Sequence, residues 1–203
     1  RNIVCFSISN SMSSSGNVMQ LAAEELNAQD LITVIDSANL STGIGLLVIE
    51  AAILAQNNKT AAEISVAVEN LKPYVRASFV VDTLTYLHRG GRCSAIAAMA
   101  GGLLKLHPQI IVEHGAMKPT KKYRGKMDSV ILSYVKDMEP ALKHARPDRV
   151  FITHSGCEPT IINAVRSYLE GLGIFREILE TRAGGVISSH CGPGTLGVLF
   201  IES

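Results

Sequence analysis

The sequence predicts an α/β protein of two domains, and the order of its apolar segments carries this prediction. Before residue 73, buried-strand patterns alternate with helical patterns over short links, which is typical of parallel strands in a three-layer α/β unit. After residue 73, hairpin signals predict a mixed or antiparallel sheet instead. The 203 residues, 47% of them hydrophobic, suffice for a core in each part, and we place the boundary near residue 73.

Apolar periodicity and capping residues place the individual elements. In the first part we expect strands at 3–8 and 31–35 and helices at 18–27, 41–56 and 60–73, the last beginning with a capping box of Thr60 and Glu63. In the second part we expect strands at 77–81, 109–113, 117–123, 149–154, 174–179, 186–189 and 197–201. The helices expected there lie at 82–89, 94–104, 127–144 and 159–171.

Composition argues against several classes of protein. A net charge of +1 implies no polyanionic partner, and 5% aromatic residues without tryptophan argue against a stacking platform for nucleic acid. No apolar run reaches the roughly 18 residues that a membrane-spanning helix needs. The four cysteines form no CxxC pair and the six histidines show no zinc spacing. We therefore expect reduced thiols, a cytoplasmic location and no metal site.

The hydrophobic content leaves three interpretations open. Mean hydropathy is +0.23, which is high for a soluble protein. A well-packed core explains this surplus, and so does a ligand cavity or an oligomer face. The chain also opens with Arg1 instead of methionine and runs directly into a strand. We therefore expect that an N-terminal stretch is missing.

Serines gather between the first expected strand and the first expected helix. Five of the nine residues from 9 to 17 are serine, more than helix capping requires. Free backbone N–H groups at a helix start bind carboxylates and phosphates, and serine hydroxyls add donors. An anion site and an ordinary N-terminal cap both remain open. Nearby, Asp36 and Ser41 are interpreted first as caps, whereas Gly43 and Gly45 indicate a close approach of backbone or ligand.

Two further segments combine glycines with a side chain that can bind anions. Gly90 and Gly91 precede Arg92, which could pair with a carboxylate or lie in solvent beyond a helix end. His190 is expected to end a strand before a rigid Gly-Pro-Gly turn. There it could donate to an anion, act as a base or be structural, and the neighbouring Cys191 could serve as a thiol nucleophile.

Positive charge gathers at residues 118–126, which include Lys122 and Arg124. This segment could dock an acidic partner or a nucleotide phosphate, or it could be a solvated hairpin arm. The sequence contains no Walker A motif and no Gly-x-Gly-x-x-Gly fingerprint. Any phosphoryl transfer would therefore need the machinery of a partner.

Several motifs occur in a fixed order along the chain. They are Ile-Ser-Asn-Ser-Met-Ser at 8–13, Val-Ile-Asp-Ser at 34–37, Ser-x-Gly-x-Gly from 41, Asp-Thr-Leu-x-Tyr-Leu-x-Arg-Gly-Gly-Arg at 82–92, Pro108, Lys-x-Arg-Gly at 122–125 and His-x-Gly-Pro-Gly-Thr-x-Gly at 190–197. Together they resemble the bacterial DegV family over essentially the whole chain. One such motif is weak, but this many in the right order are specific.

The resemblance implies a fold, a ligand and a partner. Residues 1–73 would be the remainder of a three-layer α/β/α domain with a parallel sheet. Residues 74–203 would be a two-layer α/β domain with a mixed, largely antiparallel sheet. One long-chain fatty acid would lie between and within the domains, its acyl chain in a tunnel lined by helices 44–55 and 95–104. Family members serve as the lipid-binding subunit of bacterial fatty acid kinase, whose separate ATP-binding subunit converts the carboxylate to an acyl phosphate.

The resemblance also assigns roles to individual residues. It implies that the chain needs no cofactor and carries out no catalysis alone. The carboxylate-binding residues would be Ser13, Ser14, His190 and Arg92, and the partner-docking residues would be Lys122 and Arg124. Ser14 stands where the family usually has glycine, which leaves the backbone shape of the loop open, and His107 stands where lysine is common. A further N-terminal loop that helps to hold the carboxylate in the family is absent here.

Two alternatives to the carrier remain. One is an acyl hydrolase that uses Ser13 or Cys191 with His190. The other is a regulatory or interaction protein whose lipid is structural. The carrier predicts co-purified lipid and no turnover without a kinase, whereas the hydrolase predicts burst release from activated esters.

Overall fold

The computed structural model describes residues 2–92 and 106–203, which form two compact units. Unit 1 comprises Arg1–Val75 and the hairpin turn His114–Ala116, and unit 2 comprises Arg76–Glu113 and Met117–Ser203. The division at Val75 lies close to residue 73. The assignment of a ligand between and within two domains stays a prediction.

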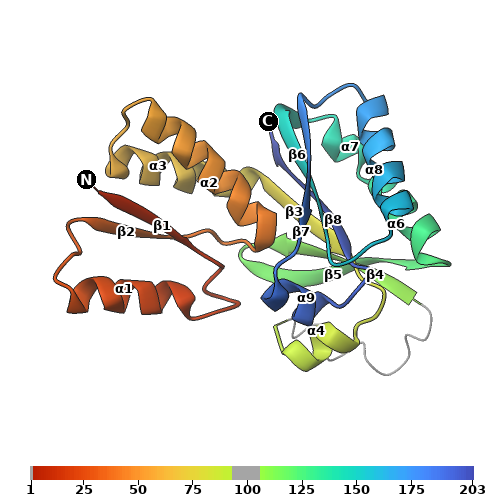
Figure 1. Cartoon of the computed structure of the whole chain (residues 1–203), viewed down its shortest axis with the longest axis horizontal. Coiled ribbons are helices and arrows are strands. Elements are labelled where there is room, and N and C mark those ends of the chain that lie inside the picture. The colour runs from red at the N-terminus through yellow and green to blue at the C-terminus, as the bar shows by residue number, and fades with distance from the viewer. Residues whose placement is uncertain (1, 93–105) are drawn as a thin grey trace. The chain divides into compact units, whose positions relative to one another are not determined.

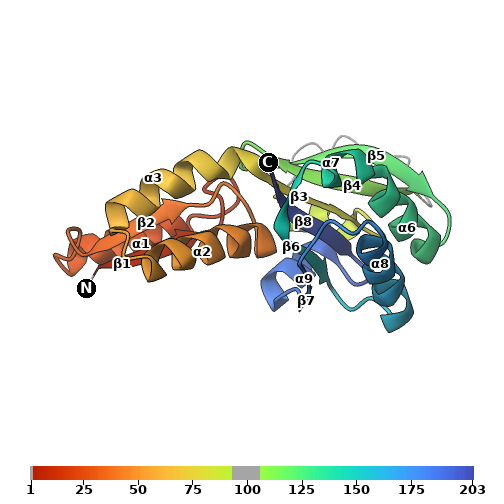
Figure 2. The same ribbon diagram turned by 90° about the horizontal axis from the view of Figure 1, so that it is seen from above.

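Unit 1 has three layers. Strands β1 (Ile3–Ser7) and β2 (Ile32–Asp36) pair in parallel. Helix α1 (Ser15–Glu25) covers one face, and α2 (Ser41–Gln56) and α3 (Ala61–Leu71) lie side by side on the other (Figures 1 and 2). Because the strands are parallel, both carboxyl ends lie at one edge of the sheet, where the loops that follow them meet.

The helix starts of unit 1 confirm one prediction and correct another. At α3, the Thr60 hydroxyl accepts from the Glu63 N–H and the Glu63 carboxylate accepts from the Thr60 N–H, so the capping box is confirmed. Ser41 is not the cap of α2 but its first residue, after Leu40. The side chain that accepts a helix-start N–H there belongs to Asn39, whose Oδ1 accepts from the Leu40 N–H.

Unit 2 contains a six-stranded mixed sheet in the order β5-β4-β3-β8-β6-β7. Its strands are β3 (Val75–Val80), β4 (Leu106–Glu113), β5 (Ala116–Arg124), β6 (Ala145–His154), β7 (Glu177–Arg182) and β8 (Leu196–Glu202). Among the described pairings, β3–β4 and β6–β8 are antiparallel and β6–β7 is parallel. The predicted α/β class, with a parallel sheet followed by a mixed one, is confirmed.

The helices of unit 2 form two groups. They are α4 (Thr85–Gly90), α6 (Met127–Asp137), α7 (Glu139–Leu142), α8 (Pro159–Gly171) and α9 (Gly185–Cys191). Helices α6, α7 and α8 pack on the sheet, whereas α4 and α9 contact each other apart from them (Figure 1). Tyr134 of α6 is fully buried, and its hydroxyl donates to the Ser78 carbonyl and accepts from the Val198 N–H. These bonds fix α6 on the sheet core.

Two segments of unit 2 differ from the sequence prediction in kind. The expected strand 186–189 is part of helix α9, where the Ser188 N–H donates to the Gly184 carbonyl. The β-branched pair Val-Ile favours a strand in the sequence. In the structure, the position between β3 and β6 in the sheet is filled by β8, and residues 186–189 are helical instead. The expected helix 127–144 divides at Met138, because Pro140 has no N–H to continue the α-helical ladder.

Other differences concern ends of elements. The expected strand 174–179 begins at Glu177, because Phe175 instead packs against the hydrophobic core. The expected helix 82–89 begins at Thr85, whose N–H donates to the Thr83 hydroxyl. The expected helix 94–104 lies outside the described residues. None of the described helices is long and apolar enough to cross a membrane, and the longest, α2, has 16 residues.

Candidate functional site

The Ser-rich loop, residues 9–14, joins β1 to α1 at the carboxyl end of the unit 1 sheet. Ser9 is buried, and its N–H donates to the Asn39 carbonyl at 2.9 Å. Its hydroxyl donates to the Gly115 carbonyl in the hairpin turn at 2.7 Å. Ser9 therefore holds the loop from two sides, although no sequence pattern distinguishes it from the other serines of the loop.

Asp36 ties this loop to the one that follows β2. Its carboxylate accepts from the N–H of Asn10 at 3.3 Å and from the N–H of Ala38 at 2.9 Å. A carboxylate used in this way repels an anion instead of binding it. The structure therefore favours the interpretation of Asp36 as a cap.

Ser13 and Ser14 stand where α1 begins. Ser14 is the N-cap residue and makes no side-chain cap bond. The Ser13 hydroxyl accepts from the Ser15 N–H at 3.2 Å and lies 3.1 Å from the Ser15 hydroxyl. Both serines lie at a helix N-terminus, whose backbone N–H groups and dipole favour a carboxylate. Their role in binding one stays a prediction.

A buried hydroxyl lies beneath the start of α1. Ser7 is 2% exposed, and its Oγ has no hydrogen-bond partner among the described residues. A Cβ on Gly16 would lie 2.8 Å from this oxygen and 2.6 Å from the Asn10 Oδ1. Gly16 thus allows the first turn of α1 to approach the end of β1. Ser7 could not be singled out from the sequence, because a lone serine at the end of an apolar strand carries no motif.

The two glycines near the start of α2 differ in their surroundings. A Cβ on Gly43 would lie 2.0 Å from the Asn39 Oδ1, whereas the nearest atom to one on Gly45 is 3.9 Å away. The close approach predicted for this segment is therefore present at Gly43. It is made by the Asn39 side chain, which is itself buried and holds the loop.

Helices α4 and α9 bring two distant motifs together in unit 2. A Cβ on Gly90 would lie 2.5 Å from the His190 Cδ2, and one on Gly192 would lie 2.3 Å from the Tyr86 ring. The Gly-Gly-Arg segment and the segment around His190 thus pack through two glycines. Both clearances are specific to glycine, because any other residue would place its Cβ in a ring.

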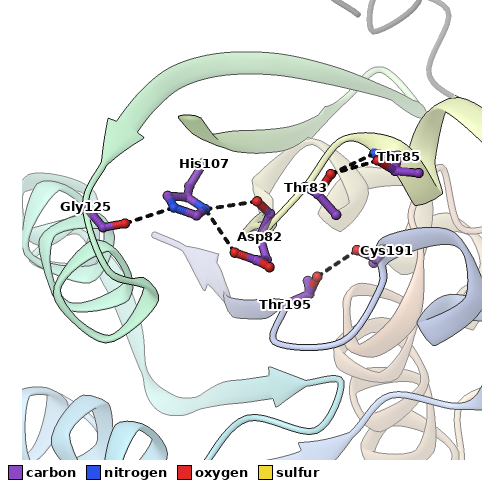
Figure 3. Close-up of polar contacts among 7 residues, drawn as sticks. All are labelled: Asp82, Thr83, Thr85, His107, Gly125, Cys191 and Thr195. Atoms are coloured by element: carbon purple, nitrogen blue, oxygen red, sulfur yellow. Dashed lines mark hydrogen bonds and ion pairs between the residues drawn. The ribbon is translucent and has the colours of Figure 1, made fainter. Parts of the chain in front are cut away.

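The chain after His190 is fixed by hydrogen bonds. The Thr195 hydroxyl donates to the Cys191 carbonyl at 2.9 Å (Figure 3), and the Ser155 hydroxyl donates to the Gly192 carbonyl. The Ser155 N–H donates to the Thr195 carbonyl at 2.9 Å. The rigid turn predicted here is present, although His190 enters it from a helix and not from a strand.

His190 and Arg92 both retain side-chain nitrogens that bond to no described residue. The His190 Nδ1 lies 2.9 Å from the Val186 carbonyl, so Nδ1 carries a proton and donates there. Its Nε2 has no hydrogen-bond partner among the described residues. One guanidinium nitrogen of Arg92 donates to the Gly90 carbonyl at 2.7 Å, and this carbonyl belongs to the residue against which the His190 ring packs. His190 and Arg92, which the family resemblance predicts to bind the carboxylate, therefore lie on adjoining segments.

Cys191 is a poor candidate for a nucleophile. Its side chain is buried, and burial raises the pKa of the thiol to about 12. A thiol must ionise to attack an acyl carbon, so almost none is reactive near neutral pH. This observation argues against the acyl hydrolase that would use Cys191.

The edge strand β5 separates its positive charges between two faces. On one face Lys121 pairs with Asp137, and the Tyr123 hydroxyl donates to the same carboxylate at 2.7 Å. Burial and this carboxylate raise the pKa of Tyr123. On the other face Lys122 and Arg124 are exposed, and neither has an ion-pair partner within residues 2–92 and 106–203. Their charges are available to a partner.

A cavity of about 560 Å³ lies in unit 1 between β1, α2 and the start of α3. Val48, Ala51, Ala52 and Ala55 of α2 line it, together with Val4 and Phe6 of β1 and others. The expected helix 44–55 thus does border a cavity. That it lines an acyl tunnel stays a prediction, and its expected companion at 95–104 lies outside the described residues.

Comparison with known sequences identifies the family. All of residues 1–203 match the family described as "Uncharacterised protein, DegV family COG1307". A DegV domain-containing protein of Caldanaerobacter subterraneus subsp. tengcongensis is 31% identical over 89% of this chain. The match covers 64% of that relative, so the chain spans less than two thirds of its length.

Solved structures share the fold. A DegV family protein from Thermus thermophilus, described by its fatty acid binding, superposes with a TM-score of 0.88 at 27% identity. The alignment covers 100% of this chain and 71% of that one. The Streptococcus pneumoniae Fatty Acid Kinase (Fak) B3 protein, loaded with linoleic acid, has a TM-score of 0.85 at 20% identity, covering 100% of this chain and 72% of that one. The second likeness shows the fold alone.

Proposed function

The chain belongs to the DegV family, and on that premise we propose that it binds one long-chain fatty acid and presents the carboxylate to an ATP-binding kinase subunit. The observation that carries this proposal is the contact between α4 and α9. There a histidine whose Nε2 bonds to none of the described residues lies beside the segment of Arg92. The fatty acid binding for which the Thermus thermophilus relative is described supports the ligand class.

The chemistry of His190 suits a carboxylate. Because Nδ1 already donates to Val186, protonation of Nε2 gives an imidazolium whose second N–H points to a new acceptor. A carboxylate could accept from that N–H, and Arg92 retains further N–H donors. Unit 2 thus offers two side chains of different reach to a carboxylate.

Unit 1, taken by itself, also offers neutral groups that can bind a carboxylate. The Ser-rich loop supplies hydroxyls of Ser13 and Ser14 and the first N–H groups of α1. The buried hydroxyl of Ser7 adds a donor near the same helix start. Several converging donors are needed, because burying a carboxylate without them is prohibitively costly. Burial of the acyl chain contributes about 0.8 kcal/mol per CH₂ and would retain the ligand.

The proposed reaction belongs to the partner. A carboxylate oxygen of the fatty acid attacks the γ-phosphorus of ATP, the bond to the bridging oxygen breaks, and acyl phosphate and ADP form. The exposed charges of Lys122 and Arg124 would dock the kinase subunit. In this role the chain carries out no catalysis alone and needs no cofactor, and the use of ATP suits a cytoplasmic location.

Ligand binding is tested by loading the purified protein with oleate and following its retention by native mass spectrometry. His190→Ala should lose most of the bound oleate, because the ring nitrogen proposed to contact the carboxylate is removed. His144→Ala is a matched control, because His144 is exposed and its Nδ1 contacts only the neighbouring Pro140 carbonyl among the described hydrogen bonds. Equal retention in both variants would contradict the role of His190.

Docking is tested by the rate of ATP-dependent acyl phosphate formation with the kinase subunit from the same organism. Replacing both Lys122 and Arg124 by alanine should raise the concentration of loaded protein needed for half-maximal rate. Lys121→Ala is the matched control, since Lys121 is on the same strand but already paired with Asp137. If Lys121→Ala has the larger effect, the docking assignment is wrong.

A further inference from the structure

The contact between α4 and α9 is reciprocal, because each segment places an aromatic ring on a glycine of the other (Figure 1). Near the end of α9, the His190 ring lies where a Cβ on Gly90 would meet its Cδ2 at 2.5 Å. In the first turn of α4, the Tyr86 ring lies where a Cβ on Gly192 would meet its Cδ2 at 2.3 Å and its Cε2 at 2.7 Å. Each segment therefore supplies one ring and one glycine to the contact.

Helical spacing places both glycine contacts on one side of α4. Tyr86 and Gly90 are four residues apart, so they lie one above the other on the same face of the helix. Leu84 and Leu87 point to another side and are buried, Leu87 fully. The leucines therefore hold α4 to the interior of unit 2, whereas Tyr86 and Gly90 meet α9.

Gly192, on which the Tyr86 ring packs, is itself fixed to the sheet. Its N–H donates to the Ser188 carbonyl at 2.8 Å, and its carbonyl accepts from the Ser155 hydroxyl. The Gly194 N–H donates to the Ser155 carbonyl at 3.0 Å. Because Ser155 directly follows β6, these bonds tie the turn after α9 to the end of a sheet strand. The Tyr86 ring thus contacts a backbone that has a fixed position.

The printed bonds of the His190 ring all lie within α9. Its Nδ1 lies 2.9 Å from the Val186 carbonyl and 3.3 Å from the Ser189 hydroxyl. These contacts orient the ring relative to its own helix, but they do not set its distance from α4. That distance depends on how closely α4 approaches, and the Tyr86 ring lies between α4 and the fixed turn.

We propose that Tyr86 is a positioning residue for His190. Its ring, packed on Gly192, sets the approach of α4 at which the His190 ring lies on Gly90. The role rests on the proposed function, in which His190 contacts the carboxylate of the fatty acid. The effect belongs to the ring of Tyr86 and not to its hydroxyl, because ring carbons make the contact with Gly192.

Substitutions at Tyr86 separate the ring from the hydroxyl. Tyr86→Phe keeps every ring carbon, so it should behave as wild type. Tyr86→Leu and Tyr86→Met keep an apolar side chain without the planar ring, so α4 should settle at a different distance from Gly192. Tyr74→Leu is the matched control, because it makes the same change at a tyrosine that is 47% exposed in unit 1.

A spectroscopic test reads the position of the ring without any ligand. In isotope-labelled wild-type protein, nuclear Overhauser effects should connect the His190 Hδ2 with an Hα of Gly90, and the Tyr86 ring protons with an Hα of Gly192. The first effect should persist in Tyr86→Phe and Tyr74→Leu. It should weaken several-fold in whichever of Tyr86→Leu and Tyr86→Met remains folded.

Two spectroscopic results overturn the proposal. One is the absence of either Overhauser effect in the wild type, which needs no variant to fold. The other is a contact between His190 and Gly90 that stays at full strength in a folded protein without the Tyr86 ring.

A double-mutant cycle with oleate tests the link to binding. Retention, measured by native mass spectrometry, should fall several-fold in Tyr86→Leu, although His190 is unchanged. Tyr86→Phe and Tyr74→Leu should retain oleate as wild type does. In a His190→Ala background, Tyr86→Leu should cause little further loss, because no ring remains to be positioned. A merely structural role would lower retention by the same factor in both backgrounds.

The outcomes of the cycle separate the two proposals. An equal loss in both backgrounds contradicts the positioning role, and so does a loss in Tyr86→Phe as large as that in Tyr86→Leu. If the wild type takes up no oleate, the proposed function fails instead. The Overhauser effects then still decide whether the Tyr86 ring sets the place of His190.

Discussion

The Ser-rich loop of unit 1 and the α4–α9 contact of unit 2 are both proposed to hold a carboxylate, but different forces keep them in shape. The loop is held by hydrogen bonds, of which those from Ser9 and to Asp36 are examples. The α4–α9 contact is held by close packing at two glycines. Hydroxyl groups rotate to new partners, whereas a close-packed ring cannot accept an added methyl group.

The difference teaches which substitutions each region tolerates. In the loop, one lost hydroxyl leaves other hydrogen bonds in place, so the binding geometry degrades gradually. At the α4–α9 contact, a single Cβ displaces the ring that would donate to the ligand. Among changes that leave His190 itself in place, the largest losses of ligand should therefore follow from changes to glycines.

Gly90→Ala is expected to have the largest effect on ligand retention among these changes. The new Cβ would lie 2.5 Å from the His190 ring, which must turn away from its present position. Oleate retention, measured by native mass spectrometry, should fall roughly tenfold, equivalent to about 1.4 kcal/mol. The control is Gly171→Ala at the end of α8, where an added Cβ meets nothing within 4 Å. Similar retention in the two variants would break the comparison.

Ser9→Ala is expected to have an intermediate effect. It leaves the buried Gly115 carbonyl without its hydroxyl donor, which costs roughly 1–3 kcal/mol of folding stability. Retention should fall several-fold, less than for Gly90→Ala, because the remaining loop bonds persist. Urea unfolding measures the stability, with the exposed Ser11→Ala as control. A larger loss of ligand in Ser9→Ala than in Gly90→Ala would reverse the order proposed.

Thr60→Ala is expected to have the smallest effect on ligand retention, because it removes a single hydroxyl from the border of the unit 1 cavity, and its main effect should be on stability. It removes the capping box of α3, at a cost of about 1 kcal/mol. The bonds from Lys59 and Thr60 lower the pKa of Glu63 to about 2. The contribution of the Glu63 carboxylate is therefore present above the ordinary carboxyl range and is lost as pH falls towards 2, whereas the bond from the Glu63 N–H to the Thr60 hydroxyl does not titrate. The difference in thermal unfolding between wild type and Thr60→Ala should therefore shrink on acidification without vanishing, and a difference that grows would contradict this expectation.

Long, periodic elements of the fold could be predicted from the sequence. The span of α2, the whole of α8 and the β4–β5 hairpin follow from apolar periodicity and capping. Helix α9 could not, because seven residues with a Val-Ile pair carry no clear period and their neighbours in space decide their state. The break at Met138 was foreseeable, since Pro140 stands in the sequence.

The candidate site divides in the same way. Motifs and glycines singled out the regions of Ser13, Arg92 and His190, but not which residues contact one another. The clearance of Gly90 for His190 joins positions far apart in the chain, so no local pattern reveals it. That Lys121 and Lys122 face opposite sides of β5 could be predicted from the sequence, because alternate residues of a strand face opposite sides. That Asp137 neutralises only Lys121 depends on the packing of α6.

The most direct test of the account is mass spectrometry of an organic extract of the purified protein. We expect one long-chain fatty acid per protein chain in the extract. If the protein is purified empty, we expect it to take up one oleate per chain when oleate is supplied. An extract without fatty acid, together with no uptake on incubation with oleate, would contradict the proposal that this protein is a fatty acid carrier.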